Sequence, residues 1–594
     1  MMNDSMATTE DGISKSRAAR EDLAYDSEEE AREKKYGAGY KWVVLSNTTL
    51  GATMAAIDSS IVLISLPEIF SGLGVNPLVP GNIGLLLWML LGYLIVTSVC
   101  VVAFGRLSDM FGRVRLYNLG FLIFAAASVL IYASSYLVTG AAGALSIIML
   151  RLLQAVGGSF LFANSAALLT DAFPHTERGM ALGINGIAFA GGSIVGLIIG
   201  GFLAAIDWHL VFMISVPIGV AGAIWSYLAL HEIATIKTGR KLDVPGSIVF
   251  GVSLALLLIA LTYALLPYGT AQTGWTNPVV LASLTVGAAL MALFVYIELH
   301  ARDPMFKLDL FRNRSFAAGN ISMVLAGIAR GGLQFMLVIW LQGIWLPQHG
   351  VEFAQTPLLA AIYMLPLTFG VLVAGPIFGK LSDKHGVNVF ATSGMVLNAA
   401  CFLAMLTLPV EFALMPFMIV TFLLGVGQGM FVSPNTAAVM NAVPPEHRGA
   451  AAGMRAALQN VSYMFSIIIF FSLLIIGLGA TLHNAVYGGL VGMGVSNSTA
   501  AGASDISPTG ALFAAFLGYN PLKTIIPAKI FDNLTASQQS SIASTSFFPK
   551  LISPAFQHGI AIVLYLAIGM SLVAAVASSL RGRRSIYGIE NEER

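Results

Sequence analysis

The chain has 594 residues, of which 57% are hydrophobic and only 10% are charged, and its formal net charge is +1. Soluble domains carry about 25% charged residues, so this composition excludes a mainly soluble protein. A net charge so close to zero gives no reason to expect a nucleic-acid partner. Cys100 and Cys401 both fall inside apolar runs, so we expect from them neither a disulfide nor a metal site.

The first 40 residues are polar, with an acidic cluster at 26–30, and are predicted to form a disordered cytoplasmic tail. After them, apolar runs long enough to cross roughly 30 Å of hydrocarbon recur as far as residue 580. We predict fourteen spans, at 41–70, 81–106, 113–136, 139–173, 177–206, 208–231, 244–267, 277–300, 315–346, 355–381, 387–409, 411–442, 446–479 and 555–580. The predicted fold class is therefore an all-α polytopic membrane protein.

The distribution of basic residues predicts the orientation. The connections after even-numbered spans carry Arg106, Arg113, Arg115, Arg178, Lys237, Arg240, Lys241, Arg302, Lys307, Arg312, Arg314, Lys380, Lys384 and Arg448, and the final tail carries Arg581, Arg583 and Arg584. The short connections on the other side, 71–80, 268–276 and 347–354, contain neither Lys nor Arg. Because cytoplasmic loops are enriched in these residues, we expect both termini in the cytoplasm.

An internal repeat divides the chain into halves. The motif GRLSDMFGRVR at 105–115 has a near copy, GKLSDKHG, at 379–386, and each follows the second span of six. This predicts a six-helix bundle at 41–232, an inserted helix pair at 233–314, a second six-helix bundle at 315–580 and a final tail at 581–594. The connection at 480–554 is expected on the outer side, where 509–533 forms a short amphipathic or re-entrant element or the whole segment is a plain linker.

Charged residues at mid-depth mark candidate sites, because such groups are costly in hydrocarbon and usually face a cavity or a partner. Asp58, in the outer half of the first span, is a candidate proton carrier, since burial favours its neutral form. The alternative is a packing role with Ser59 or Ser60. Arg151, with Gln154 one turn later, is expected to pair with Asp58 if their helices touch, as part of the proton pathway or as a static strut.

Arg330 stands between glycines in GIARGG on the ninth span. We expect it either to bind an anionic group of a substrate or to pair with Asp58 across a cavity. Aromatic and polar residues at mid-span are candidate substrate contacts, although most such residues pack against helices or lipid. The candidates are Tyr93, Gln334 and Trp340, together with Trp88, Phe189 and Gln342.

The repeated motif is a candidate gate. Its residues are Gly105, Arg106, Asp109, Gly112 and Arg113 in the first copy and Asp383 in the second. We expect the two aspartates near helix N-termini, where a carboxylate is stabilised by free N–H groups, and paired with the arginines across the halves. Basic anchoring alone would explain the arginines but not the spacing that occurs twice.

These motifs resemble those of the major facilitator superfamily, and specifically its fourteen-span drug:proton antiporter branch. GRLSDMFGRVR resembles the family's motif A, and IDSSIVLISLP its first-helix motif, which implies that Asp58 is the protonation site. RLLQAVGG resembles motif B, which implies Arg151 in the proton pathway. GSIVGLIIGG resembles the antiporter motif, with Gly192, Gly196, Gly200 and Gly201 in place and Leu197 where the family has proline. Arg330 lies outside the pattern.

The sequence therefore predicts a proton-coupled secondary transporter that exports hydrophobic or amphipathic compounds by alternating access. Its partners would be protons, a small molecule and the lipid bilayer of the cell membrane, and it would act as a monomer without a cofactor. No phosphate-binding loop with the Gly-Lys-Ser/Thr ending occurs, which argues against ATP as energy source. The alternatives are a proton symporter or exporter of an organic anion that uses Arg330, and a polytopic lipid-handling protein or membrane enzyme. The scattered histidines do not favour an enzyme.

Overall fold

The computed structural model describes residues 34–37, 39–76, 79, 81–174, 177–233, 244–269, 271, 273–301, 304, 306–409, 411–444, 448–526, 531–532 and 534–581. In this part of the chain the regular elements are helices, apart from one isolated bridge between Tyr268 and Ala271. Fourteen helices are long and apolar enough to cross a membrane, which confirms the predicted number of spans. Helices dominate because a helix satisfies its own backbone polar groups within hydrocarbon.

The N-terminal bundle contains six spans, one of them broken near its start. They are α2 (Tyr40–Gly72), α3 (Asn82–Phe111), α4 (Arg113–Leu137), α5 (Gly140–Ala172), α6 (Arg178–Ile206) and α7 (Leu210–Met213) with α8 (Ser215–Ala229). Helix α2 packs most extensively on α6 and also on α5. Helix α2 is therefore packed against both α5 and α6 in this half.

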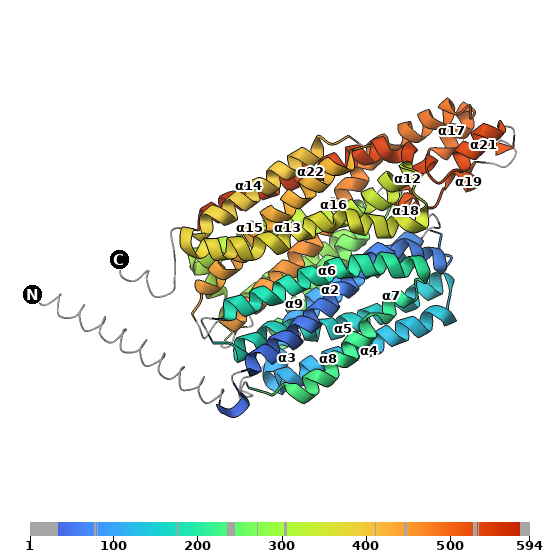
Figure 1. The fold of residues 1–594 in the computed structure, drawn as a ribbon. Coiled ribbons are helices and arrows are strands. Elements are labelled where there is room, and N and C mark those ends of the chain that lie inside the picture. The colour runs from blue at the N-terminus through green and yellow to red at the C-terminus, as the bar shows by residue number, and fades with distance from the viewer. Residues whose placement is uncertain are drawn as a thin grey trace, which may run out of the picture.

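The C-terminal bundle repeats this plan. Its spans are α11 (Arg314–Ile339) continued by the π-helical turn η3 (Trp340–Trp345) and α12 (Leu346–Gln348), then α13 (Thr356–His385), α14 (Val387–Leu406), α15 (Leu414–Asn441), α16 (Arg448–Gly492) and α22 (Phe547–Ser579). The two bundles lie side by side in Figure 1. The turns between α3 and α4 and between α13 and α14 lie at one end of the molecule, which we call the motif end.

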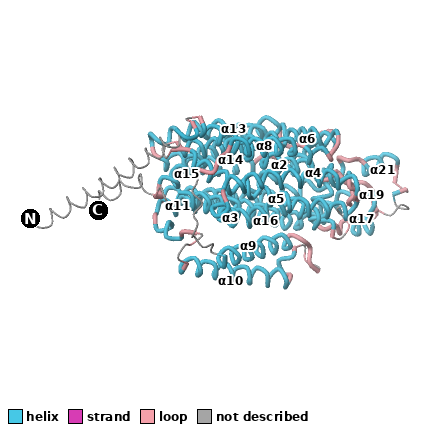
Figure 2. The backbone as a smooth tube through the Cα atoms, turned by 90° about the horizontal axis from the view of Figure 1, so that it is seen from below, coloured by secondary structure: helices cyan, strands magenta, loops and turns pink. Residues whose placement is uncertain are grey.

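Helices α9 (Val244–Ala264) and α10 (Pro278–His300) form the inserted pair. They pack on each other, and α9 also contacts α3 of the first bundle and α16 of the second. Figure 2 shows the pair set to one side of the two bundles. The pair thus lies beside a seam between the halves.

The long connection before α22 folds into short helices at the opposite end of the molecule, which we call the loop end (Figure 1). These are α17 (Asn497–Ala503), α18 (Pro508–Phe516), α19 (Leu522–Ile525) and α21 (Ala536–Ala543). All nine residues of α18 are buried, and the helix packs on η3 and α16. The expected connection at 480–554 is too long, because α16 continues to Gly492 and α22 already begins at Phe547.

The loop end also carries direct contacts between the halves. Gln342 Nε2 of η3 donates to the backbone oxygen of Ile64 in α2 at 3.2 Å. Asn76 Nδ2 donates to the hydroxyl of Tyr519 at 3.3 Å. Among the described residues, both hydrogen bonds that join the two bundles directly lie at this end. The halves are therefore fastened together where the short helices lie.

Candidate functional site

A buried polar cluster joins α2 to α5. Gln154 Nε2 donates to Oδ1 of Asp58 at 2.8 Å, and Arg151 Nη1 lies 3.4 Å from the other carboxylate oxygen, Oδ2. The exposed fractions of Asp58, Arg151 and Gln154 are only 1%, 3% and 0%. The structure therefore brings together the three residues that the sequence predicts as the proton-coupling group.

Side chains from α3 and α4 complete this cluster. Gln154 Nε2 also donates to Oγ of Ser128 at 2.9 Å. The guanidinium carbon of Arg151 lies 5.2 Å from the centroid of the Tyr93 ring, a distance at which a cation is attracted to an aromatic face. Tyr93, which the sequence predicts as a substrate contact, is only 2% exposed, and its ring faces the Arg151 guanidinium in this conformation.

The Asp58–Arg151 pair has two electrostatic states. When Asp58 is ionised, the guanidinium balances its charge; when Asp58 is protonated, Arg151 keeps its charge, because a guanidinium does not discharge in proteins. A movement that separates the two groups would leave a carboxylate buried without its counterion, which is strongly unfavourable.

Four glycines let α6 approach both halves closely. At Gly192, Gly196 and Gly200 an added Cβ would come within 2.8 Å of α2. At Gly201 it would come within 2.7 Å of the Cα of Leu358 on α13, in the C-terminal bundle. The predicted antiporter motif therefore places α6 against α2, the helix that carries Asp58, and, one residue further along, against the opposite half.

The first copy of the repeated motif is held by ion pairs within one half. Arg113 Nη1 lies 2.6 Å from Oδ1 of Asp171, and Nη2 lies 2.7 Å from Oδ1 of Asp109. Gly112, between α3 and α4, has a φ of +103°, a conformation that favours glycine. The expected pairing of Arg113 across the halves is wrong in this conformation, because both carboxylates belong to the N-terminal bundle.

The sequence predicts the aspartates of the motif near helix N-termini, but the structure places both in the last turns of helices. Asp109 lies in the last turn of α3, because that helix continues through the motif to Phe111. Asp383 lies likewise in the last turn of α13, and its side chain is outside the described residues. The carboxylate at the start of α4 is that of Glu232, which accepts the backbone N–H of Arg113 at 2.8 Å.

The motif also contacts the inserted segment. Arg106 Nη2 donates to the backbone oxygen of Pro304, which follows α10. Gly105 faces α5, where an added Cβ would lie 3.9 Å from Ala163. The motif therefore connects the N-terminal bundle to the segment that leads into the second half.

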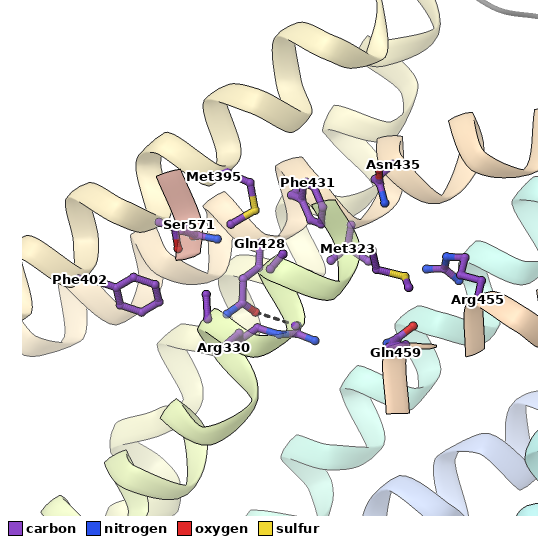
Figure 3. Close-up of a pocket in the computed structure, with 15 residues that line it drawn as sticks. Met323, Arg330, Met395, Phe402, Gln428, Phe431, Asn435, Arg455, Gln459 and Ser571 are labelled. Atoms are coloured by element: carbon purple, nitrogen blue, oxygen red, sulfur yellow. Dashed lines mark hydrogen bonds between the residues drawn. The ribbon is translucent and has the colours of Figure 1, made fainter. Parts of the chain in front are cut away.

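Arg330 does not pair with Asp58 across the two bundles in this conformation. Asp58 instead contacts Arg151 and Gln154. Nη1 of Arg330 donates to Oε1 of Gln428 on α15 at 3.1 Å. A cavity of about 40 Å³ opens beside it. Figure 3 shows Arg330, Gln428, Arg455 and Gln459 among the side chains that line this cavity.

Two other predicted cavity residues lie elsewhere. Trp340 is 2% exposed and packs edge-on against Phe412, with ring centroids 5.1 Å apart, so it is a core residue of the C-terminal half. That it contacts substrate therefore stays a prediction, with the ring buried in this conformation. Gln334, on α11, is half-buried and does not line the cavity beside Arg330.

Sequence reasoning missed several residues that the structure places at these sites: Ser128, Asp171, Glu232 and Gln428. Gln428 carried a detectable signal, because it is polar within an apolar run. Asp171 and Glu232 carried none, because they stand at span ends, where charged residues are ordinary. Their partner, Arg113, is distant in the sequence. Arg455, about two turns into its span, is predicted from the sequence to extend toward the cytoplasmic face, whereas the structure places it in the wall of the cavity.

A family model described as Major Facilitator Superfamily matches residues 48–467 and, in a second overlapping match, 319–589. The chain belongs to the major facilitator superfamily. It is a fourteen-span, drug-efflux-like secondary transporter, and a multi-pass membrane protein, in agreement with the resemblance seen in its motifs.

Several curated relatives are similar over most of the chain. The riboflavin transporter RibZ of Clostridioides difficile is 29% identical over 73% of this chain and 88% of its own length. The tetracenomycin C resistance and export protein of Streptomyces glaucescens is 27% identical over 71% and 74%. The multidrug resistance protein Stp of Mycobacterium tuberculosis is 28% identical over 74% and 77%.

Solved structures share the fold. An inward-facing bacterial homologue of the human lysosomal transporter Spinster matches with a TM-score of 0.54 and 15% identity, over 92% of this chain and 99% of that one. The proton:xylose symporter XylE matches with a TM-score of 0.51 and 13% identity, over 83% and 97%. At these identities the likeness concerns the architecture alone.

Proposed function

We propose that the protein is a proton-coupled exporter of hydrophobic or amphipathic compounds, acting as a monomer in the cell membrane by alternating access. The motif end, with both termini, faces the cytoplasm in this proposal, because the basic residues of the chain gather there. The short helices of the loop end then face outward. Multidrug resistance and antibiotic export proteins among the relatives support this class of cargo.

The observation that carries proton coupling is the buried contact of Asp58 with Arg151 and Gln154. In the proposed cycle, protonation of Asp58 frees Arg151 to move, and the return of Arg151 expels the proton. No cofactor is required, because the proton gradient supplies the energy. One inward proton yields about 2.3 kcal/mol per 100 mV and about 1.4 kcal/mol per pH unit.

Export is proposed from the antiporter-type motif of α6, and the close fit of this helix on α2 supports a link between the two helices. Gly192, Gly196 and Gly200 hold the antiporter-type helix directly against the helix of Asp58. Protonation and helix movement would therefore be mechanically linked. Leu197 stands where the family's motif has proline. Its side chain is only 2% exposed, so α6 is buried at this position as well.

The test is substrate-induced proton movement in proteoliposomes with an imposed pH gradient. Lipophilic cations, organic anions and riboflavin are added, and lumenal pH is recorded with cargo flux for both orientations. Asp58→Asn should abolish the proton movement that cargo induces. Asp309→Asn is the matched control, because that carboxylate is 89% exposed and far from the cluster in sequence. Unchanged proton movement in Asp58→Asn would overturn the proposal.

A further inference from the structure

Among the described residues, three arginines inside the C-terminal half have no acidic partner. They are Arg330 on α11, Arg455 on α16 and Arg581 directly after α22. Each bonds to a neutral group within the described part of the chain: Arg330 to Gln428, Arg455 Nη2 to Oγ1 of Thr436 at 2.6 Å, and Arg581 to Oδ1 of Asn435. Arg151 of the N-terminal half differs, because Asp58 balances its charge.

The five helices that line the space beside Arg330 offer no carboxylate, whereas α13, which packs on α15, carries Asp383, whose side chain is outside the described residues. The sequences of α11, α14, α15, α16 and α22 contain neither Asp nor Glu. Burial lowers the pKa of Arg581 to about 10, which leaves the group charged at neutral pH. This half of the protein therefore carries excess positive charge in its interior.

The charge borders a cavity. Arg330, Gln428, Arg455 and Gln459 line it, and Asn435, the partner of Arg581, lies on the same wall (Figure 3). Nε of Arg455 is buried there without a hydrogen-bond partner. The cavity thus contains a guanidinium N–H without an acceptor, on Arg455, beside side-chain amides that can accept or donate hydrogen bonds.

Two physical arguments indicate what fills the cavity. A buried guanidinium without a counterion is unfavourable, and it does not relieve this by losing its proton. Guanidinium groups bind carboxylate and phosphate oxygens with short, charge-assisted hydrogen bonds. A volume of about 40 Å³ suits a group of a few atoms rather than a whole drug molecule.

We propose that this cavity binds the anionic group, a carboxylate, sulfonate or phosphate, of an amphipathic compound. This rests on the proposed transport function and names the class of cargo: compounds with an acidic head, whose apolar remainder lies outside the cavity. The two halves then have separate tasks, because the N-terminal cluster holds the proton and the C-terminal cavity holds the anion. Exchange of one inward proton for one outward anion moves two charges, so transport responds to the membrane potential.

The test measures binding without any gradient. The full chain, purified in detergent, is titrated with benzoate and with its neutral counterpart benzamide at constant ionic strength, and the melting temperature is recorded. Benzoate should raise Tm by about 1–2 °C in a saturable manner, whereas benzamide should not. Arg330→Gln and Arg455→Gln should each weaken benzoate binding by about tenfold or more, and Arg330→Lys should retain part of it.

Controls separate this proposal from proton coupling and from lipid binding. Asp58→Asn should bind benzoate normally even if it no longer couples to protons, so each proposal fails independently. Arg312→Gln, an exposed arginine, should bind as the wild type does. In nanodiscs, benzoate binding that persists with zwitterionic phosphatidylcholine but is lost with anionic phosphatidylglycerol would show that an anionic lipid headgroup occupies the site and would overturn the assignment to cargo. Equal responses to benzoate and benzamide, or full binding by Arg330→Gln, would overturn the proposal.

Discussion

The side chain of Glu232 accepts hydrogen bonds from the first two backbone N–H groups of α4, at 2.8 Å from Arg113 and 3.0 Å from Val114. The acid that follows the sixth span thus caps the third. Arg113 in turn holds Asp109 and Asp171. The motif end of the N-terminal half is therefore a single network, built from residues at three connections of the chain: α3 to α4, the end of α5, and the segment after α8.

Loss of this cap should destabilise the N-terminal half. Glu232→Ala removes the acceptor of two backbone donors and the negative charge at a helix N-terminus, and should lower the free energy of unfolding by about 0.5–2 kcal/mol. Glu232→Gln, which keeps one acceptor oxygen, should cost less. Chemical unfolding in detergent measures both. Equal stability of Glu232→Ala and the wild type would contradict a capping role.

The Asp58–Arg151 pair should show strong energetic coupling. Arg151→Met leaves a buried carboxylate without its counterion and should cost about 3–5 kcal/mol. The double variant with Asp58→Asn should recover much of the lost stability, because neither buried charge then remains. A double-mutant cycle of unfolding free energies measures the coupling. Additive changes in unfolding free energy for the two substitutions would mean that the Asp58–Arg151 contact contributes no coupling energy.

Gly196→Ala should push α6 away from α2. An added Cβ would lie 2.6 Å from the backbone oxygen of Ile57, which is too close for any real side chain. We expect a loss of about 1–3 kcal/mol in stability, the usual cost of overpacking, together with loss of transport. Gly191→Ala is the control on the same helix, because its Cβ would meet nothing within 4 Å; similar effects of both variants would refute this explanation.

Helix α18 should behave as part of the C-terminal core. Phe513 is fully buried and stacks on Phe471 of α16, with ring centroids 5.3 Å apart. Phe513→Ala should cost about 3–5 kcal/mol, whereas Ser540→Ala, at an exposed position of the same connection, should cost almost nothing. Thermal unfolding of the two variants tests this. A connection that served only as a linker would tolerate both.

Much of the membrane architecture could be predicted, because hydrocarbon penalises every exposed backbone group and every stray charge. The same penalty made Asp58 and Arg151 conspicuous. The surroundings of Trp340 could not be predicted, because no sequence period indicates the π-helical turn that begins there. Helix α16 was cut short in the prediction because polar residues such as His483 resemble a loop, although contacts with α17 and α18 keep that segment helical.

The inserted helix pair makes the transporter asymmetric toward the lipid around it. Helix α9 lies against α3 and α16, so the seam where those two helices meet is screened from the acyl chains. The second seam runs between α6 and α13, at which Gly201 meets Leu358. We expect that a membrane-dissolved compound that approaches the boundary between the halves from the side would meet the α6–α13 flank, which the inserted pair does not contact.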